Sequence, residues 1–247
     1  MTLDPVPFSL VAVDIEGYSR RDNMGHVELR QGLRGLCDDA FGEIGVPADV
    51  RQDQGDAFLI LVESSVAKAR LVADLVNEFS IALGQFNRSR RLEERMRLRV
   101  ALHAGDVHLD GTGYGGEAVV AVMRLIEADA LREALKKAPS DLAVIVSGQL
   151  HRDVVVQRYR GIDPTEYREV LVSRKEFSQP AWIRVPGLPH TPPANQAPSQ
   201  PLTTSGGVHF GAAATFSGPT SFGGHAAGRD VHVPGRDLNV HGAEQDD

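Results

Sequence analysis

The sequence predicts an α+β fold in which helices pack on a mixed or antiparallel sheet. Apolar runs of strand length alternate with longer amphipathic segments along residues 8–185, which is the pattern of interleaved strands and helices. A short glycine-containing link within residues 49–62 indicates a hairpin, and therefore antiparallel neighbours. The first elements run strand, helix, hairpin, helix, strand, which is the order of a ferredoxin-like sandwich.

The first half of the chain alternates between the two kinds of periodicity. Residues 8–13 form an apolar run that predicts a buried strand. The next segment carries apolar side chains at helical spacing until Gly45 and Pro47 end the pattern. Ser64 or Ser65 can cap the following helix. We expect strands at 8–13, 49–53 and 57–62, and helices at 24–45 and 64–89.

The second half continues the pattern and completes the globular part. Residues 96–103 alternate between apolar and polar side chains, as a half-buried strand does. Ala104 and Gly105 predict a break, so that residues 107–109 form the second strand of a hairpin. We expect the remaining helices at 117–128, 129–137 and 148–155, and the remaining strands at 142–146, 167–172 and 181–185, in a domain that spans residues 1–186.

Composition restricts the classes of function. Apolar residues make up 42% and charged residues 24% of the 247 residues, as in ordinary soluble domains. The net charge of −7 disfavours nonspecific nucleic-acid binding, so we expect no nucleic-acid partner. The single cysteine, Cys37, cannot form an internal disulfide, which favours a reducing, cytoplasmic compartment. No signal-peptide pattern and no apolar run of about 18 residues is evident, so we expect no membrane partner.

Two acidic turns stand out within the predicted sheet. Asp14 directly follows the apolar run that ends at Val13, and Asp56 directly precedes the strand of residues 57–62. If the two strands are neighbours, both carboxylates lie at one edge of the sheet. Carboxylates in that arrangement suit a hard divalent cation and the phosphates that it carries.

Several motifs, taken in order, resemble the class III nucleotide cyclases. Residues 11–19 resemble the metal-binding turn of that family, and residues 54–58 resemble its second metal-binding hairpin. Residues 99–107 resemble the central hairpin, and residues 116–127 resemble the helix that carries a ribose-orienting Asn and a transition-state Arg. Residues 172–182 resemble the terminal hairpin with its phosphate-binding Lys. The resemblance therefore implies the class III cyclase type of ferredoxin-like sandwich.

The resemblance implies a metal and phosphate site in this chain. Asp14 and Asp56 would hold two divalent ions, Mg²⁺ or Mn²⁺, with help from the backbone carbonyl of Ile15. Backbone amides of the turn that follows would contact the phosphates of a nucleoside triphosphate; these residues are Glu16, Gly17, Tyr18 and Ser19.

The resemblance also implies a homodimer with active sites at the subunit interface. Arg124 and Lys175 would come from the second subunit and stabilise charge in the transition state. The reaction would join the ribose 3′-oxygen to the α-phosphate and release pyrophosphate. The ions would lower the pKa of the 3′-hydroxyl and neutralise the leaving phosphates, so no separate protein base is required.

Three positions depart from the family pattern. Val120 occupies the position of the ribose-orienting Asn and cannot hydrogen-bond a ribose. Gln52 stands where many members carry a purine-reading Lys or Glu, and the second base-reading position falls near Gly113. This pocket supports neither adenine nor guanine and would suit bacterial relatives in anti-phage defence that make cyclic pyrimidine nucleotides. Val120 also favours the alternative, which is an inactive cyclase-homology domain that acts as a nucleotide sensor or adaptor.

The chain changes character after the predicted domain. Residues 187–205 are rich in proline and predict an extended linker. Residues 206–247 are rich in Gly and His, and residues 228–234 are repeated in altered form at 235–241. Short alternating apolar runs between glycines can stack as cross-β. Residues 206–241 are similar to amyloid signalling motifs, which implies self-assembly or an adaptor partner; a disordered appendage is the alternative.

Overall fold

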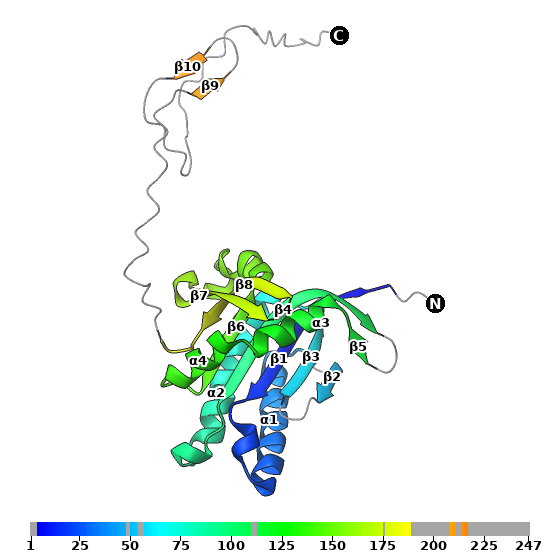
Figure 1. Cartoon of the computed structure of the whole chain (residues 1–247), viewed down its shortest axis with the longest axis vertical. Coiled ribbons are helices and arrows are strands. Elements are labelled where there is room, and N and C mark those ends of the chain that lie inside the picture. The colour runs from blue at the N-terminus through cyan, green and yellow to red at the C-terminus, as the bar shows by residue number, and fades with distance from the viewer. Residues whose placement is uncertain are drawn as a thin grey trace, which may run out of the picture. The chain divides into compact units, whose positions relative to one another are not determined.

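The computed structural model describes residues 4–47, 50–53, 57–109, 113–174, 176–188, 208–210 and 214–216, the backbone alone at 50–53 and in the last two ranges. The chain divides into two compact units, Met1–Pro192 and Pro193–Asp247. The first unit contains the main sheet and its helices, which Figure 1 labels along the chain. The strand order of the main sheet is β2-β3-β1-β4-β6-β8-β7, and β5 pairs with β4 outside this path.

The main sheet is mixed. The pair β4 and β6 is parallel, and every other neighbouring pair in the main sheet is antiparallel among the described residues. The first four strands adopt the arrangement β2-β3-β1-β4, which is the predicted ferredoxin-like order. The strands are β1 (Val6–Ile15), β2 (Val50–Asp53), β3 (Ala57–Glu63), β4 (Leu98–Leu109), β5 (Tyr114–Gly115), β6 (Leu142–Ser147), β7 (Arg168–Arg174) and β8 (Phe177–Arg184).

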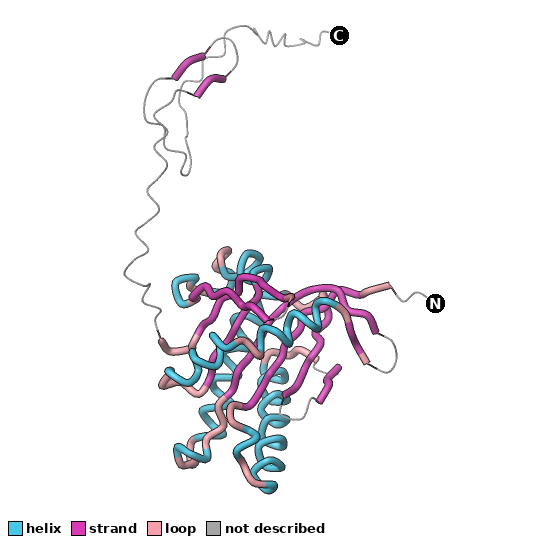
Figure 2. Tube along the Cα trace, in the orientation of Figure 1, coloured by secondary structure: helices cyan, strands magenta, loops and turns pink. Residues whose placement is uncertain are grey.

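Helices cover both faces of the sheet (Figures 1 and 2). Helices α1 (Asn23–Glu43) and α2 (Val76–Asn87), the latter preceded by the π-helical segment η2 (Arg70–Leu75), pack on one face. Helices α3 (Glu117–Ile126) and α4 (Asp129–Lys137) pack on the other. The remaining helical segments are η1 (Tyr18–Arg20), η3 (Leu92–Glu94), α5 (Gly148–Leu150), η4 (His151–Val155), η5 (Tyr159–Gly161) and η6 (Pro164–Glu166).

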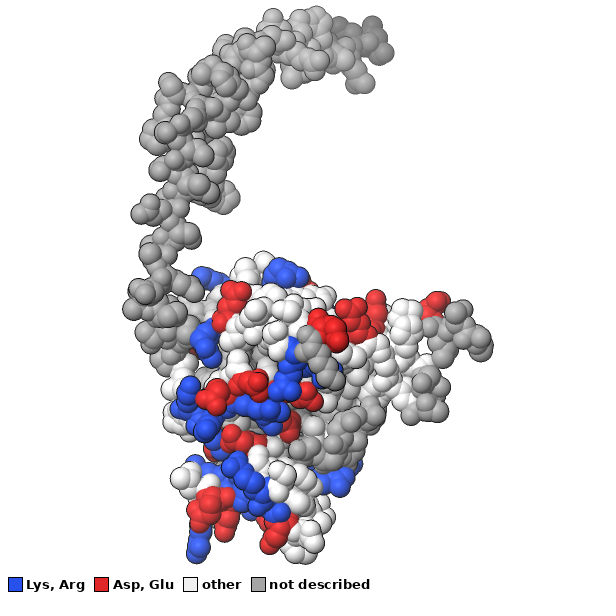
Figure 3. All heavy atoms as spheres, in the orientation of Figure 1, with Lys and Arg blue, Asp and Glu red and all other residues white. Residues whose placement is uncertain are grey.

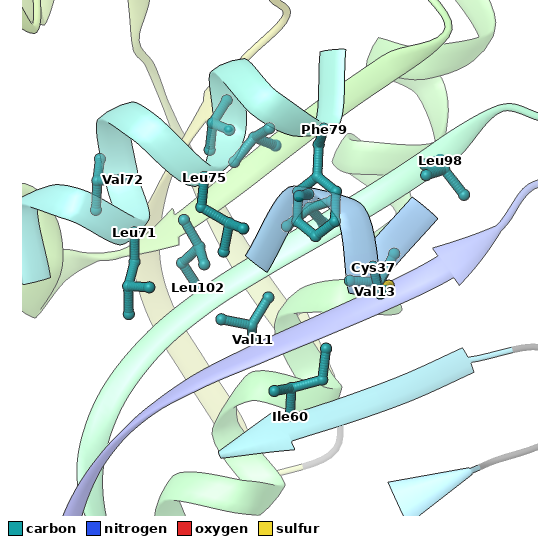
Figure 4. Packing of buried hydrophobic residues seen from close by; sticks show 14 of the residues in the cluster. Val11, Val13, Cys37, Ile60, Leu71, Val72, Leu75, Phe79, Leu98 and Leu102 are labelled. Atoms are coloured by element: carbon teal, nitrogen blue, oxygen red, sulfur yellow. The ribbon is translucent and has the colours of Figure 1, made fainter. Parts of the chain in front are cut away.

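Side chains of β1 point alternately to the two faces of the sheet and so belong to both layers of the core. Val11 and Val13 belong to the cluster under α1 and α2, whereas Leu10 and Ala12 belong to the cluster under α3 and α4. Figure 4 shows the first cluster, in which side chains of three strands meet those of α1, α2 and η2. Cys37 is fully buried there, where a free thiol acts as a small apolar core side chain. Because both faces are covered, β1 is apolar at nearly every position, as the continuous run in the sequence indicates.

One prediction about this sheet is wrong. Residues 98–109 form the single strand β4, and its hairpin partner is β5 rather than residues 107–109. Gly105 does not break β4, because it pairs with Phe8 of β1 within a continuous ladder. A Cβ at position 105 would lie 2.9 Å from the Cβ of Ala118, so the glycine allows α3 to approach the strand closely. The glycine signal in the sequence reflects this contact between helix and strand.

The second unit contains one described hairpin. Strands β9 (Val208–Phe210) and β10 (Ala214–Phe216) pair in antiparallel register, with Ala214 opposite Phe210. Within the described part of the chain, no helix has the length and apolar character needed to span a membrane.

Candidate active site

Asp14 lies at the end of β1, in the middle of the sheet. Its backbone is in register with Ala57 of β3 on one side and with Arg99 of β4 on the other. The residue is only 8% exposed. By the alternation of β1, its side chain shares the sheet face of Leu10 and Ala12, which is the face that α3 and α4 cover. The predicted metal ligand is therefore a buried carboxylate at a strand end.

Arg99 compensates this buried charge. Its guanidinium forms an ion pair with the Asp14 carboxylate, and the two side chains are 11% and 12% exposed. A carboxylate so little exposed to water requires a cation beside it. The sequence prediction did not name Arg99 as a site residue. Its place in the motif of residues 99–107, on the strand that neighbours β1, was the signal that could have found it.

Two predicted site residues lie outside the described residues. These are Asp56, the second metal ligand, and Lys175, the phosphate-binding lysine. Ala57, which follows Asp56 in the sequence, is in register with Asp14, so β1 and β3 are neighbouring strands and the condition for the metal-site prediction is met. Gln52 is in register with Leu59 on β2, and its side chain is outside the described part.

The predicted phosphate turn begins directly after β1. Gly17 has φ of +69°, a left-handed conformation that glycine adopts without strain, and η1 follows it. The Glu16 amide donates to the carbonyl of Arg97 at 2.8 Å, and the Glu16 carboxylate accepts from the Arg97 guanidinium at 2.8 Å. The Glu16 amide is therefore already used within the protein. The amides that remain for a phosphate are those of Gly17, Tyr18 and Ser19.

The Ile15 side chain is buried, and its backbone is in register with Leu98 of β4. The carbonyl of Ile15 therefore belongs to the rigid end of a central strand rather than to a free loop. This fits the predicted role of that carbonyl as a metal ligand beside Asp14.

Val120 and Arg124 lie one turn apart on α3 and so share a face of the helix. Val120 is 51% exposed. The Arg124 guanidinium is 3.5 Å from the Glu127 carboxylate, which is also 3.7 Å from the guanidinium of Arg174. Arg174 directly precedes Lys175 in the sequence, and its ion pair with Glu127 holds the described end of β7 beside α3. Among the described residues, no ion pair joins Arg124 to Asp14.

Gly113 lies just before β5, beside open space. A Cβ at this position would meet no atom within 4 Å. The neighbouring Tyr114 hydroxyl donates to the carbonyl of Leu59 at 3.1 Å and so ties β5 to β3. Burial raises the pKa of Tyr114 to about 12, which keeps this hydroxyl protonated as a donor at neutral pH. The position predicted to read the base thus has open space beside it, and the neighbouring Tyr114 holds β5 to β3.

The residues present fit a hard divalent cation in part. Among the described residues, which do not include Asp56, no cluster of three or more His, Cys, Asp or Glu side chains could hold a metal ion. Asp14 and the carbonyl of Ile15 supply oxygen donors, which Mg²⁺ and Mn²⁺ prefer. The ion pair with Arg99 marks the same carboxylate as a site where positive charge is required.

Comparisons with known proteins agree on the fold. No protein-family model and no curated protein matches the sequence. Among solved structures, the chain is similar to an adenylate/guanylate cyclase/hydrolase from Silicibacter pomeroyi, at 22% identity and a TM-score of 0.55 over 75% of this chain and 99% of that one.

Two further structures extend this agreement. The guanylyl cyclase Cya2 is similar at 17% identity and a TM-score of 0.52, over 74% of this chain and 92% of that one. A bacterial light-regulated adenylyl cyclase is similar at 14% identity and a TM-score of 0.51, over 73% of this chain and 53% of that one. The chain therefore has the α+β fold of the adenylate and guanylate cyclase catalytic domains.

Proposed function

We propose that this chain is a nucleotide cyclase that converts a nucleoside triphosphate to a 3′,5′-cyclic nucleotide and pyrophosphate at a homodimer interface. The observation that carries the proposal is the buried pair of Asp14 and Arg99 at the end of the central strands. A strand end that holds a desolvated carboxylate, followed by a glycine turn, suits a metal-bound triphosphate. The cyclase fold supports the same assignment.

In this proposal, Asp14, Asp56 and the carbonyl of Ile15 hold two divalent ions, Mg²⁺ or Mn²⁺. When bound, the ions would activate the ribose 3′-hydroxyl and neutralise the leaving phosphates. Arg99 balances the Asp14 carboxylate while the ions are absent. Once they supply that positive charge, its guanidinium is available to a phosphate oxygen, for which a planar fork of N–H donors is well suited.

A second copy of the chain completes the proposed site. Arg124 and Lys175 of that copy stabilise negative charge that builds in the transition state. The ion pairs of Glu127 with Arg124 and Arg174 keep the two segments together on one surface. Val120 is 51% exposed, and an apolar side chain exposed to this degree favours coverage by a partner. We propose that this surface faces the second subunit.

The base and ribose pocket comprises Gln52, Gly113 and Val120. Gly113 presents no side chain, and the space beside it is open. Val120 offers no hydrogen bond to the ribose. Such a pocket lacks the charged groups that read a purine, and we propose a pyrimidine product, as in bacterial anti-phage signalling.

The test is product analysis with each nucleotide. The purified chain is incubated with ATP, GTP, CTP or UTP and Mn²⁺, and cyclic products are identified by mass spectrometry. We expect one cyclic pyrimidine nucleotide, and D14N should lower its rate by at least about 100-fold. The matched control D106N changes an exposed aspartate of β4 and should leave the rate unchanged. D56N tests the second proposed ligand. Absence of a cyclic product from all four nucleotides would refute the proposal that this chain is a nucleotide cyclase.

One observation favours a second function. The exposed Val120 removes the polar group that would orient the ribose, so the site could bind nucleotide without cyclising it. The chain would then act as a nucleotide sensor or adaptor. Tight binding of a nucleoside triphosphate, measured by calorimetry, together with no cyclic product would select this function over the enzyme.

We further propose that residues 206–241 recruit partners or assemble, joined to the catalytic domain of residues 1–186 by the linker of residues 187–205. The antiparallel pairing of β9 with β10, two short strands within this segment, supports the proposal. A peptide of residues 206–241 should bind an amyloid-specific dye. A peptide that stays soluble and dye-negative would contradict assembly.

A further inference from the structure

A basic pocket adjoins the phosphate turn on the side away from β3. It has a volume of about 280 Å³, and its charged lining comprises four arginines and two glutamates: Arg20, Arg21, Arg95, Arg97, Glu16 and Glu93. Figure 3 shows charged side chains gathered at the end of the molecule where α1 begins and α2 ends. Because the whole chain carries a net charge of −7, this local excess of positive charge is unusual for the protein. We call it the arginine pocket.

Two of the four arginines already interact with carboxylates or carbonyls of the protein. Arg97 binds the Glu16 carboxylate at 2.8 Å and also donates to three backbone carbonyls, those of Leu135, Ala138 and Ser140. Arg95 lies 3.8 Å from the carboxylate of Asp141. Both side chains line the pocket. Arg97 neutralises Glu16 and Arg95 pairs with Asp141, so the charge of both arginines is already compensated within the protein.

Arg20 and Arg21 are the other two positive charges of the lining, and the remaining carboxylate there is that of Glu93. The Arg20 guanidinium packs on the phosphate turn, since a Cβ at Gly17 would lie 2.7 Å from its Nη2. Arg21 donates to the carbonyl of Arg95 at 3.2 Å, which holds it at the pocket. No carboxylate among the described residues forms an ion pair with Arg20 or Arg21. Two guanidiniums are thus held beside the turn without an ion-pair partner in the part of the chain that the structure describes.

We propose that the arginine pocket binds the terminal phosphate of the nucleoside triphosphate through Arg20 and Arg21, and retains the pyrophosphate after reaction. This inference rests on the proposed function, because it takes the turn amides and Asp14 as the site of the inner phosphates. The two arginines line the same pocket as Glu16 and Gly17 of the turn, so a phosphate that extends beyond the turn amides would lie beside them. Guanidiniums bind phosphate oxygens through two parallel hydrogen bonds, and these are among the stronger bonds in proteins. The pocket would therefore select triphosphates over diphosphates.

Calorimetry with inorganic probes tests the pocket without any chemistry. Full-length protein is titrated with pyrophosphate and with tripolyphosphate, with and without Mn²⁺. We expect R20A/R21A to weaken tripolyphosphate binding at least about tenfold for each arginine removed. R20K/R21K should recover part of the affinity, because the charge remains and the bidentate geometry does not. The control R132A removes an exposed arginine of α4 whose partner is Asp129 and should change nothing.

The outcomes separate this proposal from the cyclase function. If wild-type protein and R20A/R21A, shown to be equally folded by their melting temperatures, bind tripolyphosphate equally, the pocket proposal is wrong even when cyclic product is formed. If the wild-type protein binds tripolyphosphate through these arginines but forms no cyclic product, the pocket proposal is supported and the proposed cyclase activity is refuted. In an active enzyme, R20A/R21A should raise KM for the triphosphate more than it lowers kcat and should weaken product inhibition by pyrophosphate. An unchanged KM would contradict the proposal.

Discussion

Asp14 and Arg99 are opposite charges placed in register on neighbouring strands, at a point where water has little access. Burial of either charge alone is costly, and removing one partner of such a pair typically costs about 3–5 kcal/mol. The ion pair therefore maintains a desolvated carboxylate in a folded protein before any cation arrives. In the proposed enzyme, the affinity for a divalent ion would depend on how readily the Arg99 guanidinium leaves the Asp14 carboxylate.

Two histidines give the protein a predictable response to acid. Burial lowers the pKa of His103, and the Glu117 charge offsets this in part. Burial and then the Arg152 charge lower the pKa of His151. Because these pKa values lie below that of an unfolded histidine, about 6.5, the unfolded chain takes up protons first as the pH falls. Their contribution to stability is complete above that value and is lost as the pH falls through it towards the folded pKa.

We therefore expect the melting temperature to decrease from about pH 7 to about pH 5.5, and the double variant H103Q/H151F to show a shallower decrease. Phenylalanine at position 151 keeps the stacking on Trp182, where the ring centroids are 4.0 Å apart. Thermal unfolding at several pH values is the measurement. Identical slopes for both proteins would show that these histidines do not set the response.

At the scale of secondary-structure elements, strand β4 packs closely against helix α3. Gly105 faces Ala118, and a Cβ there would come within 2.9 Å of the Ala118 Cβ. Neither atom is the end of a flexible chain, so α3 must move away from the sheet to make room. Since α3 also carries Val120 and Arg124, the packing of this glycine controls the position of the proposed interface surface.

We expect G105A to destabilise the protein by about 1–3 kcal/mol, as overpacking of a core does. In the background of A118G the same change should cost less, because the second substitution removes the clashing methyl group. Denaturant unfolding of the four proteins of this cycle measures the coupling. Gly84 of α2 offers a matched control, since a Cβ there meets nothing within 4 Å and G84A should be neutral or stabilising. Equal costs of G105A in both backgrounds would exclude the contact.

At the scale of the whole molecule, the proposed site needs two subunits. Asp14 lies at a strand end inside one copy, and no ion pair among the described residues connects it to Arg124. If Arg124 acts across a symmetric interface, a dimer of D14A with R124A contains one site with both defects and one intact site.

We expect each variant alone to be inactive and an equimolar mixture to recover about a quarter of wild-type activity, since half of the randomly formed dimers carry one working site. The measurement is cyclic-nucleotide formation after subunit exchange, with a double variant D14A/R124A mixed with wild type as the control. A mixture as inactive as its components would place Arg124 outside the partner's site.

The sequence predicted most of the fold and part of the site. The apolar run of β1, the helical spacing of α1 and the hairpin of β2 and β3 are local patterns, and the structure confirms each of them. Asp14 at the end of β1 and the glycine turn after it were also predicted, because both follow from neighbours in the chain. Gly105 misled the prediction, since a glycine in a strand signals a turn and a close helix equally well.

The sequence by itself determined the order of elements, the strand end that carries Asp14 and the presence of a turn at Gly17. Only the tertiary structure decided that Arg99 pairs with Asp14 and that the backbone carbonyl of Arg97 accepts a hydrogen bond from the Glu16 amide. It also decided that Arg20 and Arg21 line one pocket. The physical reason is the separation in sequence over which each kind of interaction acts. Periodicity and turn chemistry act over a few residues, whereas the partner of a buried charge comes from a strand more than eighty residues away, brought alongside by the sheet.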